Sequence, residues 1–194
     1  MYPWEEIEKI IENISEELGE QEIYKLLKST TFFKEPASSK FHHCYKGGLA
    51  KHSLGVYFNF LRLCKAYDIE DKKFAFRISM LHDLCKIGTY QSIYPEEYKK
   101  IAFPEPVLGH GDSSIFISLK GGIELSNEET ACIKWHLACP SDHYEEKNRY
   151  EQVKNKYIRL SLFQQADYLD SRFPDLVQDE IKKQEKLLYP RNEL

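Results

Sequence analysis

Four histidines and one aspartate recur along the chain at nearly regular intervals, and their side chains could bind metal ions. They are His52, His82, His110, His136 and Asp167. Each interval is about what one helix, a loop and part of the next helix require, so each residue could lie on a different helix. Helical bundles build metal sites from inward-facing side chains of neighbouring helices. The spacing therefore predicts one shared interior site; the other interpretation is four separate structural histidines, each satisfied by a backbone carbonyl.

The His82-Asp83 pair is the sharpest part of this pattern. It lies near the end of an apolar helical segment, Met80-Leu81-His82-Asp83-Leu84-Cys85-Lys86. An unpaired carboxylate is costly to bury, and metal coordination is one of the few ways to offset that cost. Lys86 comes four residues after His82 and three residues after Asp83, so on a helix it would lie on the same face as this pair. Its ammonium group suits a phosphate oxygen, although a helix C-terminus also favours a solvated lysine.

The segments between these residues have the apolar periodicity of helices. One example is the stripe formed by Ile7, Ile10, Ile11 and Ile14, which has the spacing of an amphipathic helix. Strict alternation of apolar and polar residues is nearly absent, so we predict no sheet and an all-α fold: a single helical bundle with the metal site between its helices. The predicted helices cover residues 4–17, a short segment around 23–27, 49–64, about 72–86, 111–119, 127–137, 153–171 and 174–188.

Several residues mark where these helices begin and where the chain is irregular. Ser126 followed by Glu129 forms a capping box, which marks a helix start. Pro174 suits the first turn of the last helix. The Gly47-Gly48 pair makes residues 33–48 irregular. Residues 89–109 form a loop that is long enough to cover a functional site.

The composition is that of an ordinary globular domain. The chain has 194 residues, a net charge of -4 and a pI near 6.0, so it has no global attraction for nucleic acid. No apolar run approaches the roughly 20 residues of a membrane span. The first residues lack the pattern of a secretory signal, and the five cysteines form no CxxC pair. We expect a cytoplasmic protein with reduced cysteines and no membrane partner; the sequence leaves the oligomeric state open.

The residues singled out above stand in motifs that follow one another in a familiar order. These motifs are Gly47-Gly48-Leu49-Ala50-Lys51-His52-Ser53, Leu81-His82-Asp83-Leu84-Cys85-Lys86, Gly109-His110-Gly111, Trp135-His136 and Ala166-Asp167-Tyr168-Leu169-Asp170. With them the sequence resembles the HD-domain metal-dependent phosphohydrolase superfamily. The resemblance covers residues 41–171. It leaves residues 1–40 as an N-terminal helical extension and 172–194 as a C-terminal helix packed on the same domain.

The resemblance implies a role for each motif residue. His52, His82, Asp83 and Asp167 match the four metal ligands that mononuclear and dinuclear members share. His110 and His136 match two further histidines of the dinuclear members, which implies two divalent transition-metal ions. Imidazole and carboxylate ligands do not distinguish among Mn, Fe, Co, Ni and Zn. Such a metal pair would lower the pKa of a bound water for attack on phosphorus, and Asp83 and Lys86 are the predicted catalytic residues.

Three positions beside these ligands leave alternatives open. Asp170 lies one turn after Asp167 and could be the ligand in its place. His42 and His43 stand in a segment that looks like the one before the first ligand in exonuclease and phosphodiesterase relatives. We predict that His43, together with Lys86, binds substrate, and a surface-exposed histidine pair is the alternative. Cys85 stands where relatives often carry glycine.

The predicted function is hydrolysis of a phosphate ester or phosphodiester in a small phosphorylated substrate, in the first place a nucleotide. The acidic pI counts against long nucleic acid, so a 3′-5′ exonuclease-like activity ranks second. A different reaction class is also open, because some HD-fold proteins hold two irons with the same six ligands and act as oxygenases. A non-catalytic binding module is the third alternative, although the complete ligand set argues against it.

Overall fold

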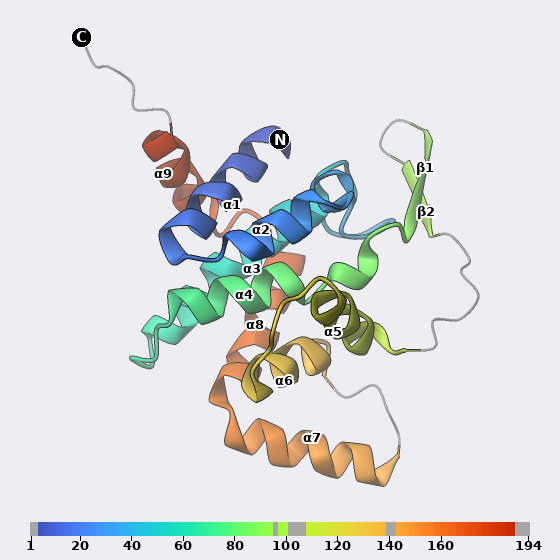
Figure 1. Ribbon diagram of the computed structural model, residues 1–194, viewed down its shortest axis with the longest axis vertical. Coiled ribbons are helices and arrows are strands. Elements are labelled where there is room, and N and C mark those ends of the chain that lie inside the picture. Colours follow the sequence, from blue (N-terminus) through green and yellow to red (C-terminus); the bar gives the residue numbers. More distant parts are fainter. Residues whose placement is uncertain (1–3, 95–96, 101–107, 139–142, 189–194) are drawn as a thin grey trace.

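The computed structural model describes residues 4–94, 97–100, 108–138 and 143–188, and the chain over these ranges is mainly helical (Figure 1). This confirms the predicted all-α bundle, with one small hairpin added. The helices are α1 (Trp4–Leu18), α2 (Gln21–Lys28), α3 (Gly48–Lys65), α4 (Lys72–Leu81), α5 (His110–Lys120), α6 (Asn127–Trp135), α7 (Tyr144–Lys156), α8 (Ile158–Arg172) and α9 (Gln178–Leu188). The fold also contains two short 3₁₀ helices, η1 (Phe32–Lys34) and η2 (Leu84–Lys86), and two strands, β1 (Tyr90–Tyr94) and β2 (Glu97–Lys100).

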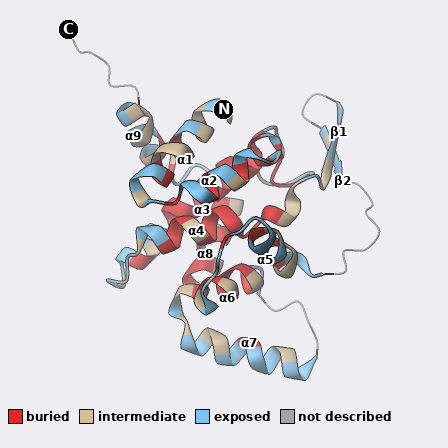
Figure 2. Ribbon diagram, viewed as in Figure 1, coloured by how far each residue is buried: buried red, intermediate tan, exposed pale blue. Residues whose placement is uncertain are grey.

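Helix α3 forms the centre of the core. It packs against α8, α4 and α1, and most of its residues are buried, as the red ribbon of Figure 2 shows. A helix that is apolar on nearly all sides is stable only when it is surrounded by other elements. The polar residues that α3 nevertheless buries, His52 among them, therefore need partners inside the protein.

The N-terminal and C-terminal helices belong to the same hydrophobic core. Helix α1 buries the isoleucine stripe Ile7, Ile10, Ile11 and Ile14, as its periodicity predicts, and α9 contributes Ile181. The capping box at the start of α6 is also confirmed, because the Glu129 N–H donates to Ser126 Oγ over 3.2 Å. No helix among the described residues is both long enough and apolar enough to cross a membrane.

Three predicted helix boundaries are wrong. Helix α4 ends at Leu81 rather than near residue 86, the predicted helix 153–171 is divided at the extended residue Tyr157, and α9 begins at Gln178 instead of at Pro174. The structure also has helix α7, which the sequence did not reveal. Only Tyr150 is buried in that helix, so it carries no apolar stripe.

A further correction is the antiparallel β1–β2 hairpin in the segment predicted as a loop. Tyr90 pairs with Lys100 and Ser92 with Tyr98, with a register irregularity towards the turn. Its described side chains are exposed or half-buried on both faces, so the alternation that identifies a half-buried strand is missing. The hairpin projects from the helices beside η2 and α5 (Figure 1).

Candidate metal centre

The six residues predicted as metal ligands lie together, although they come from five separate segments. His52 lies on α3, His82 and Asp83 between α4 and η2, His110 at the start of α5, His136 at the end of α6, and Asp167 on α8. His52 Nε2 lies 3.4 Å from His82 Nε2 and 3.1 Å from Asp167 Oδ1. Their ligating atoms form overlapping groups of the size that one metal ion requires, His52–His82–Asp167 and His82–Asp83–His136. The folding of this sequence therefore produces the constellation that its spacing suggests.

His82 and His136 are held in the same way. Each caps the C-terminus of a helix, and each Nδ1–H donates to the carbonyl three residues earlier, Ser79 and Ile133, over 2.8 Å. Because a carbonyl can only accept, the proton of the neutral ring is on Nδ1. Nε2 of both rings is left as a lone-pair donor that faces the centre of the cluster, as metal binding requires.

His52 is oriented by a carboxylate instead of a carbonyl. Asp170 Oδ2 lies 2.7 Å from His52 Nδ1, on the side of the ring away from the cluster, whereas Asp167 faces Nε2 on the cluster side. The geometry therefore favours Asp167 over Asp170 as the candidate metal ligand. Asp167 lies on the cluster side of His52, whereas Asp170 orients the His52 ring from the other side. Asp170 has room because α3 has Gly55 at this point; a β-carbon there would overlap Asp170 Oδ1.

Asp83 lies at the centre of the cluster and is almost fully buried. Its Oδ2 lies 2.6 Å from Lys86 Nζ, 3.3 Å from His82 Nε2 and 3.5 Å from His52 Nε2. Its Oδ1 lies 2.8 Å from His110 Nε2 and 3.5 Å from His136 Nε2. Oδ2 therefore lies nearest to His52 and His82, and Oδ1 lies nearest to His110 and His136.

The end of α4 at Leu81 contributes to this arrangement. Successive residues of a continuous helix point about 100° apart, so His82 and Asp83 would diverge. His82 still has helical dihedral angles, whereas Asp83 has left them (φ -112, ψ 19), and Asp83 Oδ2 lies 3.3 Å from His82 Nε2. The same turn brings Lys86 onto the carboxylate.

The pKa values of the cluster are shifted by burial and by the charges it holds. Burial alone would lower the pKa of His52, but its hydrogen bonds with Asp167 and Asp170 raise it to about 9. Burial also acts against the charged form of His110, and its contacts with Asp83 and Cys85 raise that pKa to about 10. Burial would raise the pKa of Asp83, yet the neighbouring Lys86 and histidines hold it well below its usual value. In the metal-free chain, protons therefore supply the positive charge that the carboxylates require.

Two observations show that the donors fit a metal. His136 Nε2 is buried and makes no hydrogen bond within the described residues, a costly state for a polar atom in native proteins. In addition, the His52 and His82 rings present Nε2 to each other, so in their neutral forms two lone pairs would face one another. A divalent cation bound by these imidazoles and by Asp83 and Asp167 would satisfy all of them.

The adjacent His42 and His43 differ in their surroundings, and they do not form the surface-exposed pair that was the alternative prediction. His43 has a left-handed backbone (φ 48) and is buried, with Nε2 2.8 Å from Asp170 Oδ2 and Nδ1 2.9 Å from the Tyr45 hydroxyl. This geometry favours a positioning role over the predicted substrate contact. His42 instead lies against His52, with ring centroids 5.0 Å apart. Burial lowers the pKa of His42 to about 4, and its Nε2 is buried without a partner among the described residues.

A pocket of about 570 Å³ opens beside the cluster. Two of the cluster residues, His136 and Asp167, form part of its wall together with His42. Its other walls are Phe41, Leu137, Ala138, Gln164, Gln165, Tyr168, Ser171 and Arg172. His143, by contrast, is exposed at the N-terminus of α7 and is not among these residues.

Fold and site together define an all-α domain with a metal-binding histidine–aspartate centre. The family model described as HD domain matches residues 49–172, well over half of the chain, and the chain therefore belongs to the HD-domain family. No curated protein and no solved structure matches it. HD domains are commonly metal-dependent hydrolases, and membership implies that the cluster binds divalent metal.

Proposed function

We propose that this chain is a phosphohydrolase with two metal ions and a small phosphorylated substrate, in the first place a nucleotide. The observation that carries the proposal is Asp83, whose two oxygens face separate groups of histidines. One group consists of His52 and His82, with Asp167 beside His52, and the other consists of His110 and His136. Two bound cations would supply Lewis acidity to the phosphoryl oxygens and a water of lowered pKa.

Lys86 would act together with these residues by binding the transferred phosphoryl group. Its side chain is only 15% exposed, and its Nζ lies 2.6 Å from Asp83 Oδ2. It is therefore held at the cluster and is not a solvated lysine. An ammonium group has three donors, so a phosphoryl oxygen can be bound while the contact with Asp83 remains, which places positive charge where negative charge develops.

The pocket beside the cluster supports a nucleotide as the substrate. Phe41 is 83% exposed and Tyr168 is 55% exposed, although both line the pocket. Exposed aromatic rings stack with nucleobases, and the Arg172 guanidinium, 5.8 Å from the Tyr168 ring, suits a second phosphate. The lowered pKa of His42 keeps its ring neutral at physiological pH. The ring can therefore donate a hydrogen bond to a ribose hydroxyl or accept one from it.

The test is to purify the protein without chelator, measure its metals by elemental analysis, and assay hydrolysis of nucleotides, sugar phosphates and an artificial phosphodiester with several divalent ions. His82→Ala removes a central donor, and the matched variant His143→Ala removes an exposed histidine outside the pocket. We expect about two metals per chain and nucleotide hydrolysis in the wild type and in His143→Ala. His82→Ala should lose both metal and activity.

Other outcomes identify the alternatives. Two irons with oxygen consumption and no hydrolysis would indicate the di-iron oxygenase. Hydrolysis of oligonucleotides from the 3′ end in preference to mononucleotides would indicate the exonuclease-like activity. A folded protein that binds metal but hydrolyses nothing would contradict the proposal and leave a binding module.

A further inference from the structure

His110 and His136 come from two different helices, and both face the same oxygen of Asp83. His110 Nε2 lies 2.8 Å and His136 Nε2 lies 3.5 Å from Asp83 Oδ1, and the centroids of the two rings are 5.1 Å apart. Bonds from a metal ion to imidazole nitrogen are only about 2.0–2.1 Å long. One ion can therefore be bound by both rings only while the start of α5 lies close to the end of α6.

Helix α5 packs against α6 and η2 with small residues. Its buried residues are Gly111, Ser114 and Ser118. The distance between two packed helices depends on the side chains at their contact, and short side chains allow the shortest distances. The composition of this face therefore brings the backbone of α5 close to its neighbours.

Gly111 lies directly against the backbone of α6. A β-carbon at this position would overlap the Lys134 carbonyl oxygen and would lie 2.7 Å from the Ile133 carbonyl oxygen. Both are main-chain atoms, so no side chain could turn aside, and in a close-packed interior the two helices would have to move apart. The Ile133 carbonyl also accepts the hydrogen bond from His136 Nδ1. The same movement would therefore disturb the orientation of His136.

The glycine on the other side of His110 has different surroundings. Among the described residues, a β-carbon added at Gly109 would meet within 4 Å only Asp112 Oδ2, at the ordinary van der Waals distance of 3.7 Å. The backbone of Gly109 (φ -61, ψ 170) is in the extended region that any residue can adopt. Of the two glycines that flank His110, the packing thus requires Gly111 and tolerates a side chain at Gly109.

We propose that Gly111 is a positioning residue for the second metal ion. It sets the separation of His110 and His136, and through this separation it sets the affinity of the half of the centre that these two histidines form. The inference rests on the two ions of the proposed function. The first group of donors stands on α3, on α8 and at the end of α4, which pack against one another directly. A shift of α5 away from α6 should therefore weaken the second ion and leave the first ion bound.

The test compares Gly111→Ala with the matched variant Gly109→Ala, since each adds one methyl group beside His110. Competition with a chromogenic chelator gives the affinities for the first and the second Zn²⁺. We expect wild type and Gly109→Ala to bind two ions alike. Gly111→Ala should keep its affinity for the first ion and lose affinity for the second by about 10- to 100-fold, the range typical of residues that orient metal ligands.

Electron paramagnetic resonance of the manganese-loaded proteins gives a second readout. Wild type and Gly109→Ala should show the signal of a spin-coupled manganese pair, and Gly111→Ala the signal of an isolated Mn²⁺. A general loss of packing would not produce this change, because it would weaken both ions together.

Several outcomes would overturn the inference. Two ions of unchanged affinity in Gly111→Ala would do so and leave the two-metal proposal intact, whereas a single ion in the wild type would contradict both. Equal losses for the two ions, or a Gly111→Ala variant that does not fold by circular dichroism, would make Gly111 a residue of the fold as a whole. An equal effect in Gly109→Ala would show that any added bulk beside His110 is sufficient.

Discussion

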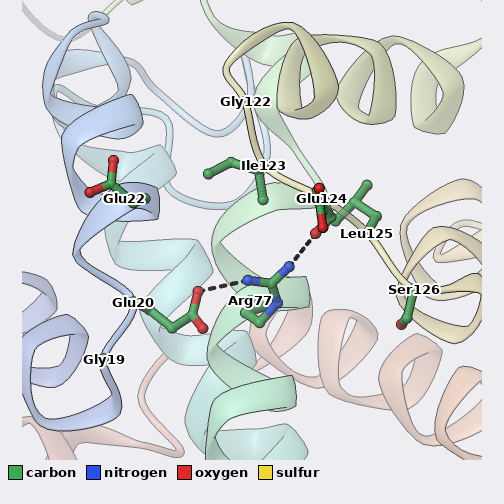
Figure 3. Close-up of a pocket in the computed structure, with 9 residues that line it drawn as sticks. All are labelled: Gly19, Glu20, Glu22, Arg77, Gly122, Ile123, Glu124, Leu125 and Ser126. Atoms are coloured by element: carbon green, nitrogen blue, oxygen red, sulfur yellow. Dashed lines mark hydrogen bonds and ion pairs between the residues drawn. The ribbon is translucent and has the colours of Figure 1, made fainter.

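The Arg77 cluster and the histidine–aspartate cluster both hold charged side chains between helices, one in the middle of α4 and the other at its end. Arg77 binds Glu20 over 2.7 Å, Glu129 and the Glu124 carbonyl, as Figure 3 shows in part. Lys73 adds a second cation at Glu20, with its Nζ 2.7 Å from Oε1. Two cations thus meet two carboxylates, and protein groups satisfy the guanidinium in three directions.

The histidine–aspartate cluster is not satisfied in this way. His136 Nε2 makes no hydrogen bond within the described residues. His52 requires a proton on Nε2, which lies 3.4 Å from the Nε2 of His82. The pockets beside the two clusters have similar volumes, about 580 Å³ beside Arg77 and about 570 Å³ beside His136. Volume therefore does not distinguish a structural site from a functional one here. The two sites differ instead in their polar contacts, because the Arg77 guanidinium is satisfied by protein groups whereas His136 Nε2, at the histidine–aspartate cluster, makes no hydrogen bond within the described residues.

The largest expected effect comes from Asp83→Asn. An amide cannot serve as a bridging carboxylate, so we expect loss of at least one metal per chain. We expect hydrolysis to fall about 1,000-fold, which corresponds to the several kcal/mol that metal ions contribute to transition-state stabilisation. Metal analysis and single-substrate kinetics measure both effects. The control is Asp112→Asn, which breaks the surface pair with Lys134 and should leave both unchanged; metal retained at full stoichiometry in Asp83→Asn would contradict the shared carboxylate.

Arg77→Met should have the opposite effects to Asp83→Asn: a loss of stability with metal binding and hydrolysis retained. Removing one partner of a buried ion pair costs about 3–5 kcal/mol, and here Glu20 and Glu129, both nearly fully buried, lose their main cation. We expect the free energy of unfolding to fall by this amount in urea titrations, while the folded fraction keeps its metals and its turnover. A loss of metal without a loss of stability would show that the two clusters are not independent.

Asp170→Asn tests the residue that orients His52 without facing the cluster. Residues that hold a ligating histidine typically contribute 10- to 100-fold in metal affinity, and we expect a decrease of about this size. Competition with a chromogenic chelator measures it. His43→Gln, which removes the other partner of Asp170 Oδ2, should give a smaller decrease, and an unchanged affinity in both variants would exclude the orienting role.

The smallest expected effect is a pH dependence of the stability of the metal-free protein, which metal binding should abolish. Folding raises the pKa of His52 from 6.5 to about 9, so protonated His52 stabilises the metal-free fold below pH 6.5. This contribution is lost as the pH rises through 9. Denaturant titrations of the metal-free protein should therefore show decreasing stability over this interval. Because metal competes with these protons, loading near pH 8 should release protons in calorimetry with different buffers, and loading without proton release would contradict the assignment of His52.

The sequence was sufficient to predict which residues the fold brings together, and it was insufficient for their supporting contacts. His52, His82, His110, His136 and Asp167 could be found because each stands in a motif at helical spacing. The roles of His42 and His43 could not, since the left-handed backbone of His43 determines which ring turns inward. The end of α4 was missed because Leu84 continues the apolar stripe that Leu81 belongs to, although α4 ends at Leu81 and Leu84 begins the 3₁₀ helix η2.

Gly55 has a consequence for attempts to stabilise this protein. Glycine in a helix interior costs roughly 1 kcal/mol relative to alanine, so Gly55→Ala would be a standard substitution for thermostability. At this position the added methyl group would meet the Asp170 carboxylate, which holds His52. This overlap opposes the gain in helix propensity and disturbs the partner of His52, so variants of α3 should be selected for metal retention as well as for melting temperature.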